Sequence, residues 1–202
     1  EKDIFHKKLE PTLKIIDSGA PLVSLLHVNF RLIYEQSIMP NYQYLIRAEL
    51  VEKLGRIANE LVKQDKTLVI RSAWRSFEHQ RILWERNLGY MKEKFPDKTD
   101  QEIHETTSYF IAPPNNSTHS TGGAIDALIF DEKTKQILDF GSNEGHRITL
   151  DKKCYPHHPD ISNLAKQNRK LMLDLFNSED FVCDLKEFWH FDYGNIGWAI
   201  EK

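Results

Sequence analysis

The alternation of apolar and polar positions along the chain predicts four helices. The first lies within 42–62, the second begins after Ser76, and the fourth covers 161–176. The third begins at a capping-box pair, Thr99 with Glu102 three positions later. The apolar residues expected to face inward are Leu50, Leu54, Ile57, Ala58 and Leu61 in the first helix, and Leu164, Leu171, Met172, Leu175 and Phe176 in the fourth.

Short apolar runs predict strands between and after these helices. Thr67–Ile70 and Ala124–Phe130 have the composition of buried strands, and two shorter strands are expected at Phe181–Cys183 and Phe188–Phe191. The helices precede and interleave with the strands without a regular βαβ alternation. The pattern therefore favours an α+β fold.

Length and segment composition indicate one domain that spans residues 1–202. Residues 1–40 show no clear periodicity and are expected to form an irregular N-terminal segment packed on it. The polar stretch 131–160 is long enough to suggest a functional loop.

Composition excludes several classes of protein. The formal net charge of −3 gives no general basic character, which argues against nucleic acid or an anionic membrane as the main partner. No apolar run approaches the roughly 18 residues needed to span a bilayer. The two cysteines, Cys154 and Cys183, are too few for a disulfide framework, and whether they pair is left open. The chain begins with Glu1 instead of Met, which favours a periplasmic or secreted location over a cytoplasmic one.

The first candidate for chemistry is the segment 117–126, in which His119 lies on a polar loop and Asp126 follows seven residues later inside an apolar strand. A carboxylate in such a strand is costly to bury unless it is paired or bound to a metal. The alternative interpretation is an Asp that caps a turn, with His119 exposed.

The second candidate is Glu187-Phe188-Trp189-His190. A zinc hydrolase needs three protein ligands, an open position for water and a carboxylate base beside it. Glu187 and His190 can supply the base and the third ligand, but on a regular strand they would face opposite sides, so a bend is required at the two residues between them. The alternative is an aromatic edge strand with a solvent-facing Glu.

The third candidate is the turn 71–76, which follows a buried strand. An arginine at such a turn can reach a cleft and bind an oxyanion or a substrate carboxylate. A structural salt bridge is the alternative.

Together, these three segments resemble the zinc D-alanyl-D-alanine peptidases of the VanX/VanY type. The family pairs an aromatic-Arg-Ser/Pro turn with a Ser-x-His-x-x-Gly-x-Ala-x-Asp segment and a later Glu-x-Trp-His. All three stand here in that order, at 74–76, 117–126 and 187–190, and the similarity runs from about Tyr44 to Tyr193. The dipeptidase branch is the nearer one, because 137–142 and 167–171 resemble its loop after the metal strand and its following helix.

The resemblance implies a fold and a set of roles. The fold would be a small, mainly antiparallel sheet flanked by helices, as in D,D-peptidases and hedgehog-like proteins, with one zinc ion in a cleft on the sheet. The zinc ligands would be His119, Asp126 and His190. The catalytic residues would be Glu187, as general base and then general acid, and Arg75, which would stabilise the tetrahedral intermediate. Ser117 would line the substrate site.

The leading hypothesis is a zinc dipeptidase that cleaves D-alanyl-D-alanine to D-alanine through a zinc-bound water. One departure from the family pattern bears on it: the dipeptidases continue with a Phe-Asp that holds the substrate's free ammonium, whereas this chain has Asn143-Glu144. Glu144 is the candidate substitute. Without it, the alternative is a D,D-carboxypeptidase or endopeptidase on peptidoglycan stem peptides.

Two further hypotheses come from other classes. A non-catalytic binding relative would be expected to lose the base or the arginine, and both Glu187 and Arg75 are present. A serine hydrolase is disfavoured because Ser117 and Ser120 lack a nucleophile-elbow context. The oligomeric state and the physiological role are left open.

Overall fold

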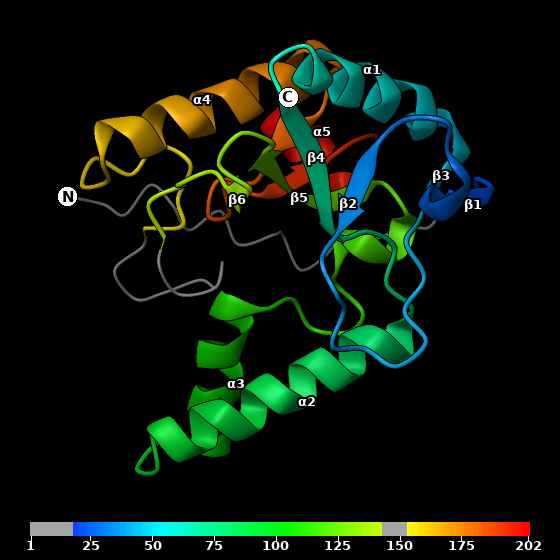
Figure 1. The fold of residues 1–202 in the computed structure, drawn as a ribbon. Helices are drawn as coiled ribbons and strands as arrows, with labels where there is room; N and C mark the ends of the chain where they lie inside the picture. The colour runs from blue at the N-terminus through cyan, green and yellow to red at the C-terminus, as the bar shows by residue number, and fades with distance from the viewer. Residues whose placement is uncertain (1–17, 143–152) are drawn as a thin grey trace.

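The structure is a computed structural model that describes residues 18–142 and 153–202. A six-stranded sheet forms its centre (Figure 1). Its strands run in the order β2-β4-β5-β8-β7, and β6 pairs with β5. Their bounds are β2 Leu32–Tyr34, β4 Lys66–Ser72, β5 Ala124–Asp131, β6 Gln136–Ile137, β7 Val182–Cys183 and β8 His190–Asp192. Only β2 and β4 pair in parallel among these, so the prediction of a mainly antiparallel sheet is confirmed.

Helices lie on two sides of this sheet. In Figure 1, α1 (Val51–Val62) and α4 (Asn163–Ser178) lie together above it. The short α5 (Ile196–Glu201) contacts β7. The helices α2 (Phe77–Lys94) and α3 (Asp100–Phe110) pack on each other and project from the opposite side. We call this helical pair the α2–α3 arm.

The hydrophobic core lies between the sheet and helices α1 and α4. Leu54, Ile57 and Leu61 of α1 are buried there, as are Met172 and Phe176 of α4. Burying side chains of this size contributes roughly 1.5–3 kcal/mol each and holds the central strands in place. Leu164 was expected to face this core, but it is 56% exposed. It is the second residue of α4, which begins at Asn163 after the cap Ser162.

The predicted helix over 42–62 is wrong in its first part. Residues Leu45–Arg47 form β3, a 3-10 turn follows at Ala48–Leu50, and α1 begins only at Val51. β3 pairs antiparallel with β1 (Leu22–Ser24), with Ile46 opposite Val23. Because this pairing joins distant parts of the chain, the local spacing of apolar residues did not reveal it.

The prediction of an irregular segment over 1–40 is also wrong in part. It contains β1, a 3-10 turn at Leu25–His27 and β2. Its first seventeen residues lie outside the described part of the chain.

Other predicted elements are confirmed, with small shifts at their ends. The capping box between Thr99 and Glu102 is present at the start of α3. The predicted strands correspond to β4, β5, β7 and β8, and the predicted helices to α1–α4. α5 was not predicted. Among the described helices, none has both the length and the apolar character required to cross a bilayer.

Candidate metal centre and active site

A cleft of about 1370 Å³ opens between elements that are distant in the sequence. Its lining comes from the ends of β4, β5 and β8, from the 3-10 turn Thr118–Thr121, and from the α2–α3 arm. His119, Asp126 and His190 lie in this cleft, and all three are buried. The sequence pattern and the fold therefore place the same residues in one cavity.

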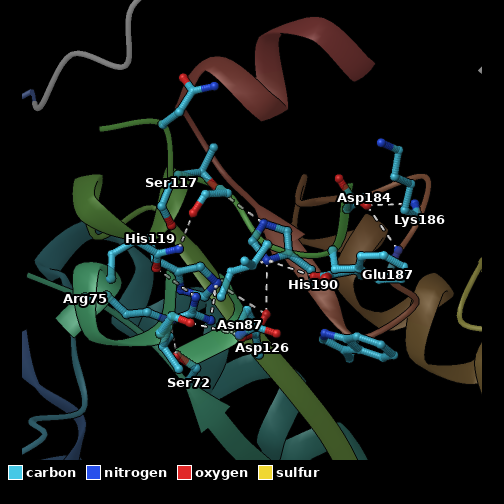
Figure 2. Close-up of a pocket in the computed structure, with 18 of the residues that line it drawn as sticks. Ser72, Arg75, Asn87, Ser117, His119, Asp126, Asp184, Lys186, Glu187 and His190 are labelled. Carbon is cyan, nitrogen blue, oxygen red and sulfur yellow. Dashed lines mark hydrogen bonds and ion pairs between the residues drawn. The ribbon is translucent and has the colours of Figure 1, made fainter. Parts of the chain in front are cut away.

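Three donor atoms of these residues converge (Figure 2). His119 Nε2 lies 3.2 Å from His190 Nδ1, and each lies close to Asp126 Oδ1, at 3.3 Å and 3.0 Å respectively. Tetrahedral zinc with bonds of about 2.0–2.1 Å requires ligand atoms about 3.3 Å apart. Two imidazole nitrogens and one carboxylate oxygen at this spacing fit a zinc ion, with a fourth position for another ligand.

The strand register brings Asp126 and His190 together. They are direct partners in the antiparallel pair β5–β8, so their side chains project from the same face of the sheet. Ser72 of β4 lies opposite Asp126 on the other side, next to a register shift between Ile70 and Ser72. Such an irregularity bends the end of the strand toward the cleft and redirects the residues that follow.

Two glycines permit the turn that places His119 in the cluster. Gly122 has a φ of 67°, and a Cβ atom at Gly123 would lie 2.6 Å from the carbonyl oxygen of Tyr193. A side chain at either position would strain or displace the turn between His119 and β5. The buried Arg47 contacts the same turn through its backbone N–H, which donates to the carbonyl of Gly122 at 3.0 Å, and its guanidinium donates to the carbonyls of the neighbouring Tyr193 and Gly194.

Hydrogen bonds to the outer ring nitrogens fix the orientation of both histidines. His119 Nδ1 donates to the carbonyl of Ala73 at 2.7 Å, which leaves Nε2 as the free acceptor in the cluster. His190 Nε2 lies 3.1 Å from Asp192 Oδ2, which leaves Nδ1 for the cluster. Asn195 Nδ2 holds Asp192 in turn, at 2.6 Å.

Sequence reasoning missed Asp192. The signal that could have found it is the period of a strand, since residues two apart share a face and Asp192 follows His190 by two.

The electrostatics of the cluster favour a positive charge at its centre. Burial alone would raise the pKa of Asp126, but His119, His190 and the Arg75 guanidinium hold it well below its usual value. Burial and the nearby guanidinium lower the pKa of His119. Burial opposes protonation of His190 as well, yet the carboxylates of Asp192 and Asp126 raise its pKa well above the ordinary value. A buried carboxylate pair around an imidazole attracts a cation, and a metal ion can take that role.

Arg75 reaches the cluster from the β4 side. Its Nη2 donates to Asp126 Oδ2 at 2.6 Å and lies 3.1 Å from His119 Nε2. Nε donates to Ser72 Oγ at 2.8 Å, and Nη1 donates to Gln80 Oε1 at 3.2 Å. The guanidinium is thus fixed beside the three donor atoms. Its contact with Asp126 is a partly buried ion pair, and in this position it is also able to donate to a bound substrate.

Glu187 lies on the other side of the cluster, and the bend expected between it and His190 is present. His190 N donates to the carbonyl of Glu187 at 3.0 Å, and Asp184 Oδ1 accepts from Glu187 N at 3.0 Å. Glu187 Oε2 lies 4.0 Å from His190 Nδ1. Figure 2 shows its side chain directed toward the cluster from the side opposite Arg75. Burial raises the pKa of Glu187 to about 8, assisted by the charge of Asp126 and opposed by His190.

The structure describes one of the two residues predicted to contact the substrate, Ser117, but not the other, Glu144. Ser117 is buried and lines the cleft, at the residue before the turn that carries His119. Glu144 lies outside the described residues. Phe188 and Trp189, the two residues between Glu187 and His190, are both buried, and Trp189 is part of the cleft lining.

The fold and site define a mixed α/β protein with a His/Asp/His centre of the kind that holds a divalent metal. A family model described as VanY, D-alanyl-D-alanine carboxypeptidase, matches residues 43–196. The chain therefore belongs to the VanY family, and the resemblance noted from the three motifs is confirmed.

Relatives of known sequence or structure agree with this assignment. A D-alanyl-D-alanine dipeptidase of Enterococcus faecalis (strain ATCC 700802 / V583) is 26% identical over 100 residues, a match that spans 50% of this chain and 46% of that relative. The solved structure of VanYB in complex with D-alanine-D-alanine is 14% identical, with a TM-score of 0.53 and coverage of 85% of this chain and 89% of that one. The LdcB LD-carboxypeptidase structure is 17% identical, also with a TM-score of 0.53, and 91% of this chain matches 72% of that one. At these identities the two solved structures indicate a shared fold.

Proposed function

We propose that this chain is a zinc peptidase that hydrolyses the D-alanyl-D-alanine bond, with the free dipeptide as its leading substrate and D-alanine as product. The observation that carries the proposal is the spacing of 3.0–3.3 Å among His119 Nε2, Asp126 Oδ1 and His190 Nδ1. Family membership and the 26% identical dipeptidase support the choice of substrate.

In this proposal, His119, Asp126 and His190 hold one zinc ion through those three atoms. When bound, zinc supplies a positive charge that polarises the peptide carbonyl and lowers the pKa of water. Asp192 and the carbonyl of Ala73 keep the two imidazoles in the orientation that binding requires.

Two side chains of this protein, Glu187 and Arg75, transfer the proton and stabilise the negative charge that develops on the substrate. With zinc bound, the charge of the ion would lower the pKa of Glu187 from the value of about 8 that burial sets. The Glu187 carboxylate would then accept a proton from the attacking water and later return it to the leaving amine. Arg75 donates from its guanidinium to the oxygen that becomes negative in the transition state. Both side chains lie beside the cluster and on opposite sides of it, so each can act without displacing the other.

A specific observation also favours the second candidate, a D,D-carboxypeptidase that trims longer stem peptides. The cleft extends from the cluster along α2 as far as Lys94, and its volume of about 1370 Å³ leaves room well beyond a dipeptide. The family model carries the name of that activity.

The test is zinc content measured together with D-alanine release. Purified protein is given D-alanyl-D-alanine or an acetylated pentapeptide that ends in D-alanyl-D-alanine. Release from the dipeptide alone supports the dipeptidase, and release from the pentapeptide supports the carboxypeptidase. Zinc binding without release from either substrate contradicts the proposed reaction.

Two variants separate the proposed roles. Glu187→Ala is expected to keep zinc and lose nearly all turnover, whereas His119→Ala is expected to lose the zinc itself. Glu93→Ala, an exposed residue of α2, is the matched control and should change neither. Full activity of the Glu187 variant, or unchanged zinc in the His119 variant, would overturn that role.

A further inference from the structure

The part of the cleft lined by the α2–α3 arm, away from the metal cluster, differs in charge from the part around the cluster. The charged residues that its helices contribute to the lining are Arg86 and Lys94, both cations, and the described lining from α2 and α3 holds no carboxylate. Tyr90 lies between them on the same face of α2 and is 50% exposed. Lys94 Nζ lies 5.6 Å from the centre of the Tyr90 ring. This side of the cleft is therefore cationic and partly aromatic.

The cations on the outer surface of α2 behave differently. Arg81 pairs with Glu78 and Glu85 at 2.6 Å and 2.5 Å, and Lys92 pairs with Asp100 at 2.7 Å. Within residues 18–142 and 153–202, neither Arg86 nor Lys94 has a carboxylate within ion-pair distance. The same helix thus neutralises its outer cations and leaves those in the cleft available for an anion.

The positions of these cations match an extended peptide that starts at the metal cluster. Gln80, near the start of α2, contacts Arg75 beside the cluster. Arg86 follows it by six positions and Lys94 by fourteen, which is about 9 Å and about 21 Å along a helix. Three residues of an extended peptide span about 10 Å and six span about 20 Å.

We propose that the α2 face of this cleft binds the part of an acidic peptide that precedes the scissile bond, and that Arg86 and Lys94 recognise its side-chain carboxylates. The first such carboxylate belongs about three residues before the bond. The proposal rests on the proposed peptidase function and adds a substrate class to it: anionic peptides longer than the dipeptide. Charge complementarity selects them, because a neutral side chain gains less from these two cations than a carboxylate does.

The test compares two acetylated pentapeptides that end in D-alanyl-D-alanine. They carry glutamate or glutamine as the third residue before the scissile bond and are otherwise identical. Wild type is expected to prefer the glutamate peptide, and Arg86→Gln to raise KM for that peptide by about two- to fivefold, as for an exposed ion pair. Lys94→Gln should leave KM for both pentapeptides unchanged, because Lys94 matches a residue about six positions before the bond; a heptapeptide with glutamate at that position should show the same rise with Lys94→Gln. Neither variant should change the kinetics of the glutamine peptide or of the free dipeptide. Arg81→Gln is the matched control, since it removes a paired cation from the outer surface of the same helix.

Equal loss on both peptides with Arg86→Gln, or no loss on either, would overturn the proposal. Cleavage of the dipeptide but of neither pentapeptide would also overturn it, while leaving the peptidase function intact. If no substrate is cleaved, the peptidase function fails. Calorimetric titration of the two pentapeptides onto the Glu187→Ala protein then tests the cationic subsite independently of turnover. Tighter binding of the glutamate peptide supports the subsite if the difference disappears when Arg86→Gln is added to the same protein, and equal binding of the two peptides overturns it.

Discussion

Replacing Arg169 of α4 with Met is expected to destabilise the protein strongly. The Arg169 side chain is buried, yet it is charged and fully engaged. Nε donates to the carbonyl of Phe140 at 2.8 Å, Nη1 to that of Tyr155 at 2.5 Å and Nη2 to that of Lys153 at 2.6 Å. The guanidinium also lies 4.2 Å from the centre of the Phe188 ring, next to Glu187.

The magnitude follows from those contacts. Met fills a similar volume but donates nothing, so three backbone carbonyls lose this donor. A buried acceptor that loses its partner costs about 1–3 kcal/mol, and the lost contact with an aromatic face adds about 1 kcal/mol. Removing the cost of burying a charge offsets part of this sum. We therefore expect a net loss of about 3–5 kcal/mol.

Urea unfolding measures the effect. With a slope of about 2–3 kcal/mol per molar urea, the midpoint should fall by about 1–2 M. Lys170→Met on the same helix is the control, because it removes only an exposed pair with Asp174, worth about 0.3–0.5 kcal/mol. Coincident midpoints for the Arg169 and Lys170 variants would refute the argument that these carbonyls depend on the guanidinium.

Three further changes have defined outcomes. Arg75→Ala should lower kcat by about 10²–10³-fold if the guanidinium stabilises the oxyanion, and a rise in KM alone would indicate ground-state binding instead. Asp192→Asn should weaken zinc binding by about 10–100-fold, measured by competition with a chromophoric chelator, and an unchanged affinity would contradict its role in orienting His190. Arg56 donates two hydrogen bonds to Glu179 and lowers its pKa below the ordinary 4.5, so this pair stabilises the fold above that pH and loses its effect as the pH falls through the lowered value. The difference in urea midpoint between wild type and Arg56→Gln should therefore shrink from pH 7 to pH 3, and a constant difference would contradict the assignment.

The sequence predicted the elements whose information is local. Thr99 and Glu102 mark a helix start by themselves, and the run at 124–130 is too apolar to lie anywhere but inside. β3 was missed because Leu45–Arg47 becomes a strand only by pairing with β1, more than twenty residues earlier. Likewise, Leu164 fits an apolar helical face, but its position in the first turn of α4 leaves it at the surface.

The candidate site was predictable for residues that stand in recognisable motifs. Motif spacing identified His119, Asp126, His190, Glu187 and Arg75, and the fold brings all five to one cleft. The supporting contacts were not predictable, because they depend on three-dimensional placement. The carbonyl of Ala73 that fixes the His119 ring has no signature in the sequence at all.

The direct pairing of Asp126 with His190 has a consequence for the order in which the protein is assembled. The donor residues lie as much as 71 positions apart, and they meet only after β5 has paired with β8. In small zinc-dependent domains, ligands close together in the chain let the metal drive folding. Here the three donors meet only once a long loop has closed, so we expect metal capture to follow folding. On that expectation the polypeptide folds first and the proposed ion binds afterwards, so the supply of metal, separate from synthesis, would set when the proposed activity begins.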